Sequence, residues 1–177
     1  PQGMYIDNYD NLYVVDSSNH RIQKFNNQGD FILAFGKKGN GKEELLRPTD
    51  IVVINDKIYI TDSENHRIQV YDLSGNWLET IGEDEQFFKN PKGIKKISEN
   101  ELIIADTEIG IIKLTLNPLT KKIIKANEKD TEEEKGLEAP VDMALDGNLF
   151  LYVADMRKPT IPIYVPEKMK YNNLDVT

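Results

Sequence analysis

Short apolar segments alternate with polar turns along most of the chain. Residues 12–15, Leu-Tyr-Val-Val, form an uninterrupted apolar run, which is typical of a strand buried on both faces. Residues 21–25 alternate polar and apolar side chains, and after a turn that contains Gly29 residues 31–35 are again mostly apolar. With a further short segment near residues 3–7, this pattern predicts four antiparallel strands within residues 1–36.

One stretch of this unit is written twice, with an offset of 46 residues. Residues 16–23 read Asp-Ser-Ser-Asn-His-Arg-Ile-Gln, and residues 62–69 read Asp-Ser-Glu-Asn-His-Arg-Ile-Gln. Gly29 and Gly75 keep the same spacing. A fixed period of about 40 to 50 residues built from strands indicates a repeat architecture, because each repeat leaves an apolar face that only a neighbouring repeat can cover.

Two further units follow with the same order of strands and less regular turns. Each unit has a proline before its first strand and an aspartate after its second: Pro1, Pro48, Pro91 and Pro140, and Asp16, Asp62, Asp106 and Asp155. The predicted units span residues 1–36, 48–82, 91–126 and 140–165, and residues 166–177 are predicted to be a polar tail. Four such four-stranded antiparallel units predict an all-β fold, with each unit one blade of a β-propeller.

The repeated Asp-Ser-x-Asn-His-Arg-Ile stretch, its following glycine and its Phe-Gly or Ile-Gly end resemble the NHL-repeat family. The link from Phe35 to Pro48 is also similar to that family's connection between blades. The resemblance extends to about Val165, although residues 109–111 and 158–160 replace Asn-His-Arg in the last two units. It implies a six-bladed ring, of which this chain would hold four blades. We therefore expect a fragment of a longer polypeptide, because a four-blade arc would leave two sheet faces in water.

Composition narrows the class of partner. The 177 residues carry a net charge of −8, and a surface of this balance disfavours nucleic acid, whose affinity rests on clustered lysine and arginine. RNA binding, as in some NHL relatives, conflicts with this negative charge, and a basic or neutral partner is favoured.

No apolar run approaches the length of about 18 residues that would indicate a membrane span. Without cysteine there is no disulfide and no Cys-ligated zinc. The compartment stays unknown, with an extracytoplasmic location slightly favoured.

The recurring aspartates and the two histidines are candidates for metal chemistry. The four carboxylates could surround a cation, or each could accept backbone N–H groups in its own loop and pair with Arg21 or Arg67. We favour the structural interpretation, because a residue that recurs in every blade is expected to stabilise the structure of the blade itself. His20 and His66 occupy equivalent positions and have no third histidine beside them, which favours a packing role. Lyase-like relatives of this fold carry metal-binding histidines near the start of inner strands, where this sequence has Gln2, Thr49, Lys92 and Val141.

The segments between the units differ in charge. Residues 37–47 are basic, residues 83–90 are acidic, and residues 127–139 are more strongly acidic. Residues 36–42 nearly spell a phosphate-binding loop, but Glu43 replaces the required serine or threonine and Pro48 prevents a following helix. We interpret this segment as a glycine-rich connection between blades. Phe87 and Phe88 lie in the next connection, where exposed aromatic side chains could anchor a partner.

These features predict a non-enzymatic NHL-repeat propeller that binds a protein or peptide partner through its loop-lined face. The predicted binding residues are Asn19, His20, Arg21, Asn65, His66, Arg67, Phe87 and Phe88. No catalytic residue, metal ligand or cofactor is predicted. The alternative is a metal-dependent enzyme of the lyase or lactonase-like propellers, with zinc or calcium near a central channel and part of its site in blades outside this chain.

Overall fold

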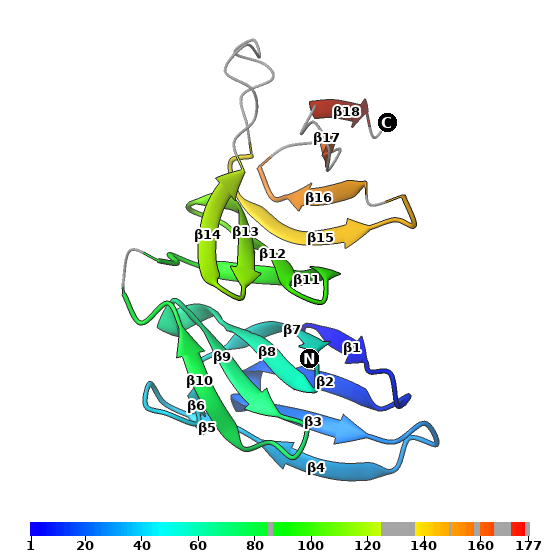
Figure 1. Cartoon of the computed structure of the whole chain (residues 1–177), viewed down its shortest axis with the longest axis vertical. Helices are drawn as coiled ribbons and strands as arrows, with labels where there is room; N and C mark the ends of the chain where they lie inside the picture. The colour runs from blue at the N-terminus through cyan, green and yellow to red at the C-terminus, as the bar shows by residue number, and fades with distance from the viewer. Residues whose placement is uncertain (85–86, 125–136, 149, 158–159, 165–170, 176–177) are drawn as a thin grey trace. The chain divides into compact units, whose positions relative to one another are not determined.

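A computed structural model describes residues 1–84, 87–124, 137–148, 150–157, 160–164 and 171–175 (Figure 1). It contains four four-stranded antiparallel sheets, each built from strands that are consecutive in the sequence. We call these sheets blades I to IV. The all-β fold of four-stranded antiparallel blades is therefore confirmed.

The strands of the blades are as follows. Blade I comprises β1 (Met4–Ile6), β2 (Leu12–Asp16), β3 (Arg21–Phe25) and β4 (Phe31–Phe35). Blade II comprises β7 (Pro48–Ile54), β8 (Lys57–Asp62), β9 (Arg67–Asp72) and β10 (Trp77–Ile81). Blade III comprises β11 (Pro91–Ser98), β12 (Glu101–Asp106), β13 (Gly110–Leu116) and β14 (Leu119–Ile124). Blade IV comprises β15 (Pro140–Leu145), β16 (Leu151–Asp155), β17 (Thr160–Tyr164) and β18 (Tyr171–Asp175).

The end of the chain differs from its prediction. The polar tail predicted over residues 166–177 is wrong for residues 171–175, which form β18 and pair antiparallel with β17. This segment lacks the apolar alternation of a buried strand. An edge strand can be held by backbone hydrogen bonds to a single neighbour, so it leaves a weak signal in the sequence.

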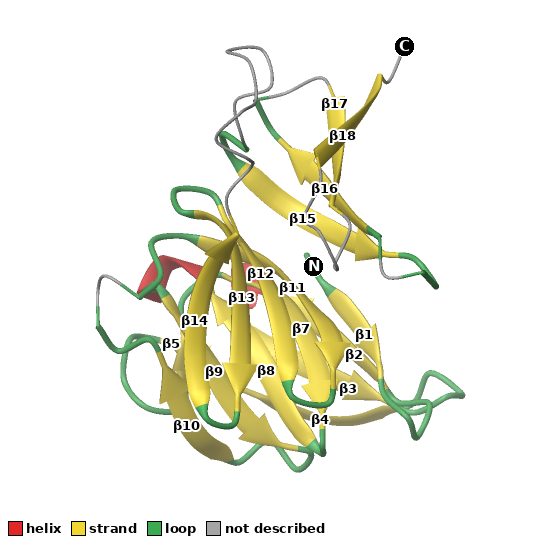
Figure 2. Ribbon diagram, turned by 45° about the horizontal axis from the view of Figure 1, so that its top comes forward, coloured by secondary structure: helices red, strands yellow, loops and turns green. Residues whose placement is uncertain are grey.

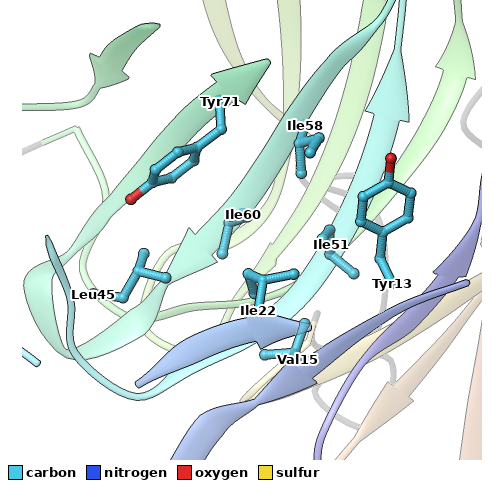
Figure 3. Close-up of a cluster of buried hydrophobic side chains, with 8 residues drawn as sticks. All are labelled: Tyr13, Val15, Ile22, Leu45, Ile51, Ile58, Ile60 and Tyr71. Atoms are coloured by element: carbon cyan, nitrogen blue, oxygen red, sulfur yellow. The ribbon is translucent and has the colours of Figure 1, made fainter. Parts of the chain in front are cut away.

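The chain divides into two compact units, Pro1–Gly93 and Ile94–Thr177. In the first unit, side chains of blades I and II form one buried cluster (Figure 3): Tyr13, Val15, Ile22, Leu45, Ile51, Ile58, Ile60 and Tyr71. Leu45 comes from the connection between the two blades, so this connection is part of the core. In the second unit, blades III and IV form a cluster of their own: Ile103, Ala105, Ile111, Ile124, Met143, Leu151 and Val153.

The repeated stretch folds into the loop between the second and third strands of blades I and II. Each copy begins with a single 3₁₀ turn, η1 (Ser17–Asn19) in blade I and η2 (Ser63–Asn65) in blade II, drawn red in Figure 2. His20 and His66 follow in the left-handed conformation, with φ of 56° and 57°. In an antiparallel meander this loop and the connection that leaves the fourth strand lie at the same end of the blade. We call this end the loop face.

No helix in the described ranges is long and apolar enough to cross a membrane.

Candidate functional site

The two copies of the repeated loop make the same internal contacts. In blade I the Asn19 amide donates to both carboxylate oxygens of Asp16, at 2.9 and 3.0 Å, and Arg21 Nε donates to Asp16 at 2.9 Å. In blade II, Asn65 and Arg67 Nε donate to Asp62, both at 2.8 Å. Each aspartate therefore orients the asparagine and the arginine of its own repeat. The pairing with the arginine agrees with the sequence prediction, and the bond to the asparagine is an addition from the structure.

Three of the recurring aspartates, Asp62, Asp106 and Asp155, also hold backbone N–H groups. Asp62 accepts a hydrogen bond of 2.6 Å from the Leu46 amide, in the connection that enters blade II. Asp155 accepts hydrogen bonds from the Glu138 and Ala139 amides in the same way. Asp106 accepts hydrogen bonds from amides of its own loop. For Asp62, Asp106 and Asp155 these contacts agree with the structural interpretation. Among the described residues there is no group of three or more His, Cys, Asp or Glu side chains that could hold a metal ion.

The two equivalent carboxylates differ in burial, and their pKa values shift in opposite directions. Hydrogen bonds from Asn19 and Arg21 lower the pKa of Asp16, against a smaller effect of burial. Asp62 is fully buried, and this burial raises its pKa despite the hydrogen bonds from Leu46, Asn65 and Arg67. The same motif thus contains a carboxylate that ionises easily in blade I. In blade II burial disfavours the ionised form of the equivalent carboxylate.

We expect Asp16 to support the fold at neutral pH and to lose this effect in acid. A carboxylate whose pKa is lowered in the folded state contributes stability above its unfolded pKa, and the contribution disappears as the pH falls through the folded value. Asp16→Asn should cost at most about 1 kcal/mol at neutral pH, because Arg21 is partly exposed. Urea titrations from neutral pH to well below 3.8 should show the difference from the native chain shrinking. A constant difference would contradict the assignment.

Blade II uses its repeated side chains to hold the connection from blade I. Asn65 donates to the Gly39 carbonyl at 2.9 Å, and the Arg67 guanidinium donates to the carbonyls of Asn40, Gly41 and Glu44 at 2.9 to 3.0 Å. The Gln69 amide adds a bond of 3.2 Å to the Glu44 carbonyl. These contacts fix the backbone of residues 39–44 against blade II.

The histidines contact the connection that leaves their own blade. The Arg47 amide donates to His20 Nδ1 at 3.0 Å, so this ring nitrogen acts as an acceptor. His66 Nδ1 lies against the Lys89 carbonyl in the next connection. The packing role predicted for both histidines agrees with these contacts. In both blades the Asn-His-Arg loop thus contacts the backbone of the connection that leaves the blade. In blade II the loop also contacts the connection that enters the blade.

The glycine-rich segment folds as a connection. Residues Lys37–Lys38 (β5) pair in parallel with residues Glu44–Leu45 (β6), and no helix follows. The Gly41 amide, which a phosphate would need, donates to the Glu44 carboxylate at 2.8 Å. The interpretation as a blade connection is confirmed. The acidic connection over residues 127–139 lies outside the described residues except for residues 137–139.

The prediction that the aromatic pair of the second connection is exposed is wrong for Phe88. Phe88 is fully buried and Phe87 is half-buried, with the two rings in edge contact at 4.9 Å between centroids. Phe88 packs so closely over Gly82 that a Cβ atom there would lie 2.6 Å from its ring. Phe88 is therefore not an exposed anchor, because Gly82, which has no side chain, leaves space for the buried ring.

Gln69 is a structural residue that was not among the predicted site residues. This side chain is fully buried, and its oxygen accepts hydrogen bonds from Trp77 Nε1 at 3.0 Å and Thr80 Oγ1 at 2.6 Å while its amide reaches the connection. It links β9, β10 and the connection. The signal that could have found it is its recurrence, since Gln23 holds the same place in the first copy.

The fold and the repeated loops define a β-propeller, and comparison with known proteins gives the family. The chain belongs to the family DUF5128, described as a 6-bladed beta-propeller, which matches residues 5–156. The Drosophila melanogaster protein brain tumor is 34% identical over 56 residues, which are 32% of this chain and 5% of that protein.

Solved structures show the same fold at low sequence identity. A catalytically inactive virginiamycin B lyase from Staphylococcus aureus, solved with quinupristin, superposes with a TM-score of 0.72 at 11% identity, covering 99% of this chain and 55% of that chain. A Bacteroides thetaiotaomicron protein of unknown function superposes with a TM-score of 0.67 at 13% identity, covering 97% of this chain and 42% of that chain. The chain thus spans about half the length of these structures, and at such identities the likeness concerns the fold.

Proposed function

We propose that the chain is a non-enzymatic binding module of the NHL-repeat type, which takes a protein or peptide partner on its loop face. The observation that carries the proposal is the fixed backbone of residues 39–44, held by Asn65, Arg67 and Gln69. A loop that is already ordered loses little conformational entropy when it binds, so more of the contact energy becomes affinity. The similarity to the protein brain tumor supports the NHL type.

The charge of the chain indicates the chemistry of the partner. With a net charge of −8, the chain favours a basic or neutral partner and disfavours nucleic acid. Two exposed carboxylates, Glu43 and Glu83, lie in the two connections on the loop face of the first unit. They offer contact points for lysine and arginine side chains of a peptide.

A selection of random peptides on the immobilised chain tests this proposal. We expect the selected peptides to be basic or neutral and to protect residues 37–47 and 63–66 from hydrogen exchange, while the turn at residues 26–30, at the other end of blade I, stays unprotected. Protection confined to that turn would contradict the assignment of the face.

The Glu43→Gln, Glu83→Gln double variant should weaken a selected basic peptide by about tenfold, since each exposed ion pair contributes up to about 1 kcal/mol. Asp10→Asn is the matched control, because Asp10 is an exposed carboxylate in the β1–β2 turn at the opposite end of blade I. Titration calorimetry at two salt concentrations measures both effects, and the loss should be smaller at high salt. Equal effects of the double variant and the control would exclude the carboxylates as contact points.

A further inference from the structure

A cavity of about 190 Å³ lies between blades I and II, beside the start of the connection that joins them. It is lined by two aromatic rings, two glycines and two charged side chains: Phe35, Tyr71, Gly36, Gly75, Lys37 and Glu43. The two charged side chains are exposed, so the cavity opens to solvent on their side. A single water molecule takes about 30 Å³ of the liquid, so the cavity has room for a larger group.

The hydroxyl group of Tyr71 is buried and has no hydrogen-bond partner among the described residues. A buried polar group without a partner costs free energy, so nearly all such groups in folded proteins are paired. Tyr13, a second fully buried tyrosine of the same cluster, donates to Asp7 at 3.0 Å. The two hydroxyls point in different directions, and that of Tyr71 lies on the side of Leu45, which belongs to the connection (Figure 3). The structure thus leaves the Tyr71 hydroxyl to a group that enters the cavity.

Negative charge predominates around this hydroxyl. Burial raises the pKa of Tyr71 most, the Asp62 and Glu43 carboxylates raise it further, and the Arg67 guanidinium lowers it. Asp62 and Arg67 balance each other as an ion pair at 2.8 Å. Glu43 forms no ion pair within the part of the chain that the structure describes. One carboxylate beside the cavity is therefore without a cation, which favours a positively charged ligand over an anion.

The lining also specifies the shape of the ligand. The two rings can pack against an apolar stem, the Tyr71 oxygen can accept a hydrogen bond, and the Glu43 carboxylate can pair with a cation. Lys37 already pairs with Glu44 at 3.6 Å, so its charge is matched. A lysine side chain meets these requirements with an apolar four-carbon stem and a compact ammonium group. The five donors of an arginine would find fewer acceptors in this lining.

We propose that the cavity between Phe35 and Tyr71 binds the side chain of a lysine residue of a partner peptide. The stem packs against the two rings, and the ammonium group donates to Tyr71 Oη and pairs with Glu43. This inference rests on the proposed peptide-binding function and names the side chain that one part of the surface takes. It adds a buried contact to the exposed ion pairs described above.

Two capped tripeptides, Gly-Lys-Gly and Gly-norleucine-Gly, are the probes, because norleucine keeps the four-carbon stem and lacks the ammonium group. Added to the ¹⁵N-labelled chain, the lysine peptide should produce saturable shifts in the backbone amide signals of Gly36, Lys37 and Gly75, which line the cavity. The norleucine peptide should bind about tenfold more weakly or less, because it makes no charged hydrogen bond. A Gly-Glu-Gly peptide should not bind at the cavity.

Tyr71→Phe should weaken the lysine peptide by about tenfold, because it removes only the hydroxyl that accepts from the ammonium group. It should leave the urea midpoint of the free chain unchanged or raise it, since this hydroxyl has no partner among the described residues. Tyr13→Phe is the matched control. It removes a hydroxyl that donates to Asp7, so it should lower the midpoint and leave the affinity for the lysine peptide unchanged.

Equal binding of the lysine and norleucine peptides would overturn the inference. So would a Tyr71→Phe variant that unfolds at lower urea concentration and binds the lysine peptide like the native chain, because the hydroxyl would then hold only a buried water molecule. Either result leaves the proposed function intact if selected peptides still protect residues 37–47 and 63–66. Lysine-specific shifts at the cavity without any selected partner would support the site and remove the wider proposal.

Discussion

Arg67→Ala is expected to lower the free energy of unfolding of the first unit by about 3 to 5 kcal/mol, because it leaves the fully buried carboxylate of Asp62 without its charge partner. The variant also removes the guanidinium donors that hold the carbonyls of Asn40, Gly41 and Glu44. The connection should therefore detach from blade II together with the loss of stability.

Arg21→Ala is the matched control. Arg21 makes the equivalent bond to Asp16, but its side chain is 43% exposed, so the loss should be about 1 kcal/mol or less. Urea unfolding followed by the fluorescence of Trp77, the single tryptophan, measures both variants, because this side chain bonds to Gln69 in blade II. Similar losses for the two arginines would show that burial of the ion pair does not decide its contribution.

Ile22→Ala is expected to cost about 2 to 5 kcal/mol, because the removed methyl groups leave a cavity in the cluster between blades I and II. Ile22 is fully buried, whereas Ile32 on the neighbouring strand β4 is 44% exposed. Ile32→Ala removes the same atoms and should cost less than about 1 kcal/mol. The same unfolding experiment compares them. If Ile32→Ala proved as costly as Ile22→Ala, its face of blade I would be buried in solution.

Much of the fold could be predicted because its signals are local. The apolar run at residues 12–15 and the alternation at residues 21–25 indicate strands by themselves, and the 46-residue offset shows that the strands recur as one unit. Pairing of Asp16 with Arg21 was predictable for the same reason, since the two residues lie on either side of one short loop.

The errors arose where residues of another segment decide the environment of a side chain or strand. Phe88 looked like an exposed loop aromatic, but its burial depends on Gly82, which leaves space for the ring. Residues 171–175 looked polar, but pairing with β17 makes them a strand. Gln69 looked like an ordinary polar position of a strand, although it bonds to both β10 and the connection that enters blade II.

The sequence by itself determined the blade plan, because strand periodicity, turn residues and repeat spacing are properties of short segments. It also determined that Asn19, Arg21 and Gln23 match Asn65, Arg67 and Gln69 as residue types. Only the tertiary structure decided that these two identical groups of side chains differ in burial and in hydrogen-bond partners. In blade II a folded connection covers Arg67, whose side chain is 12% exposed, whereas in blade I the Arg21 side chain is 43% exposed and Asn19 and Gln23 bond to Asp16. Burial and hydrogen-bond partners depend on which segments pack together, and a repeated sequence has the same local signal whether or not a neighbour covers it.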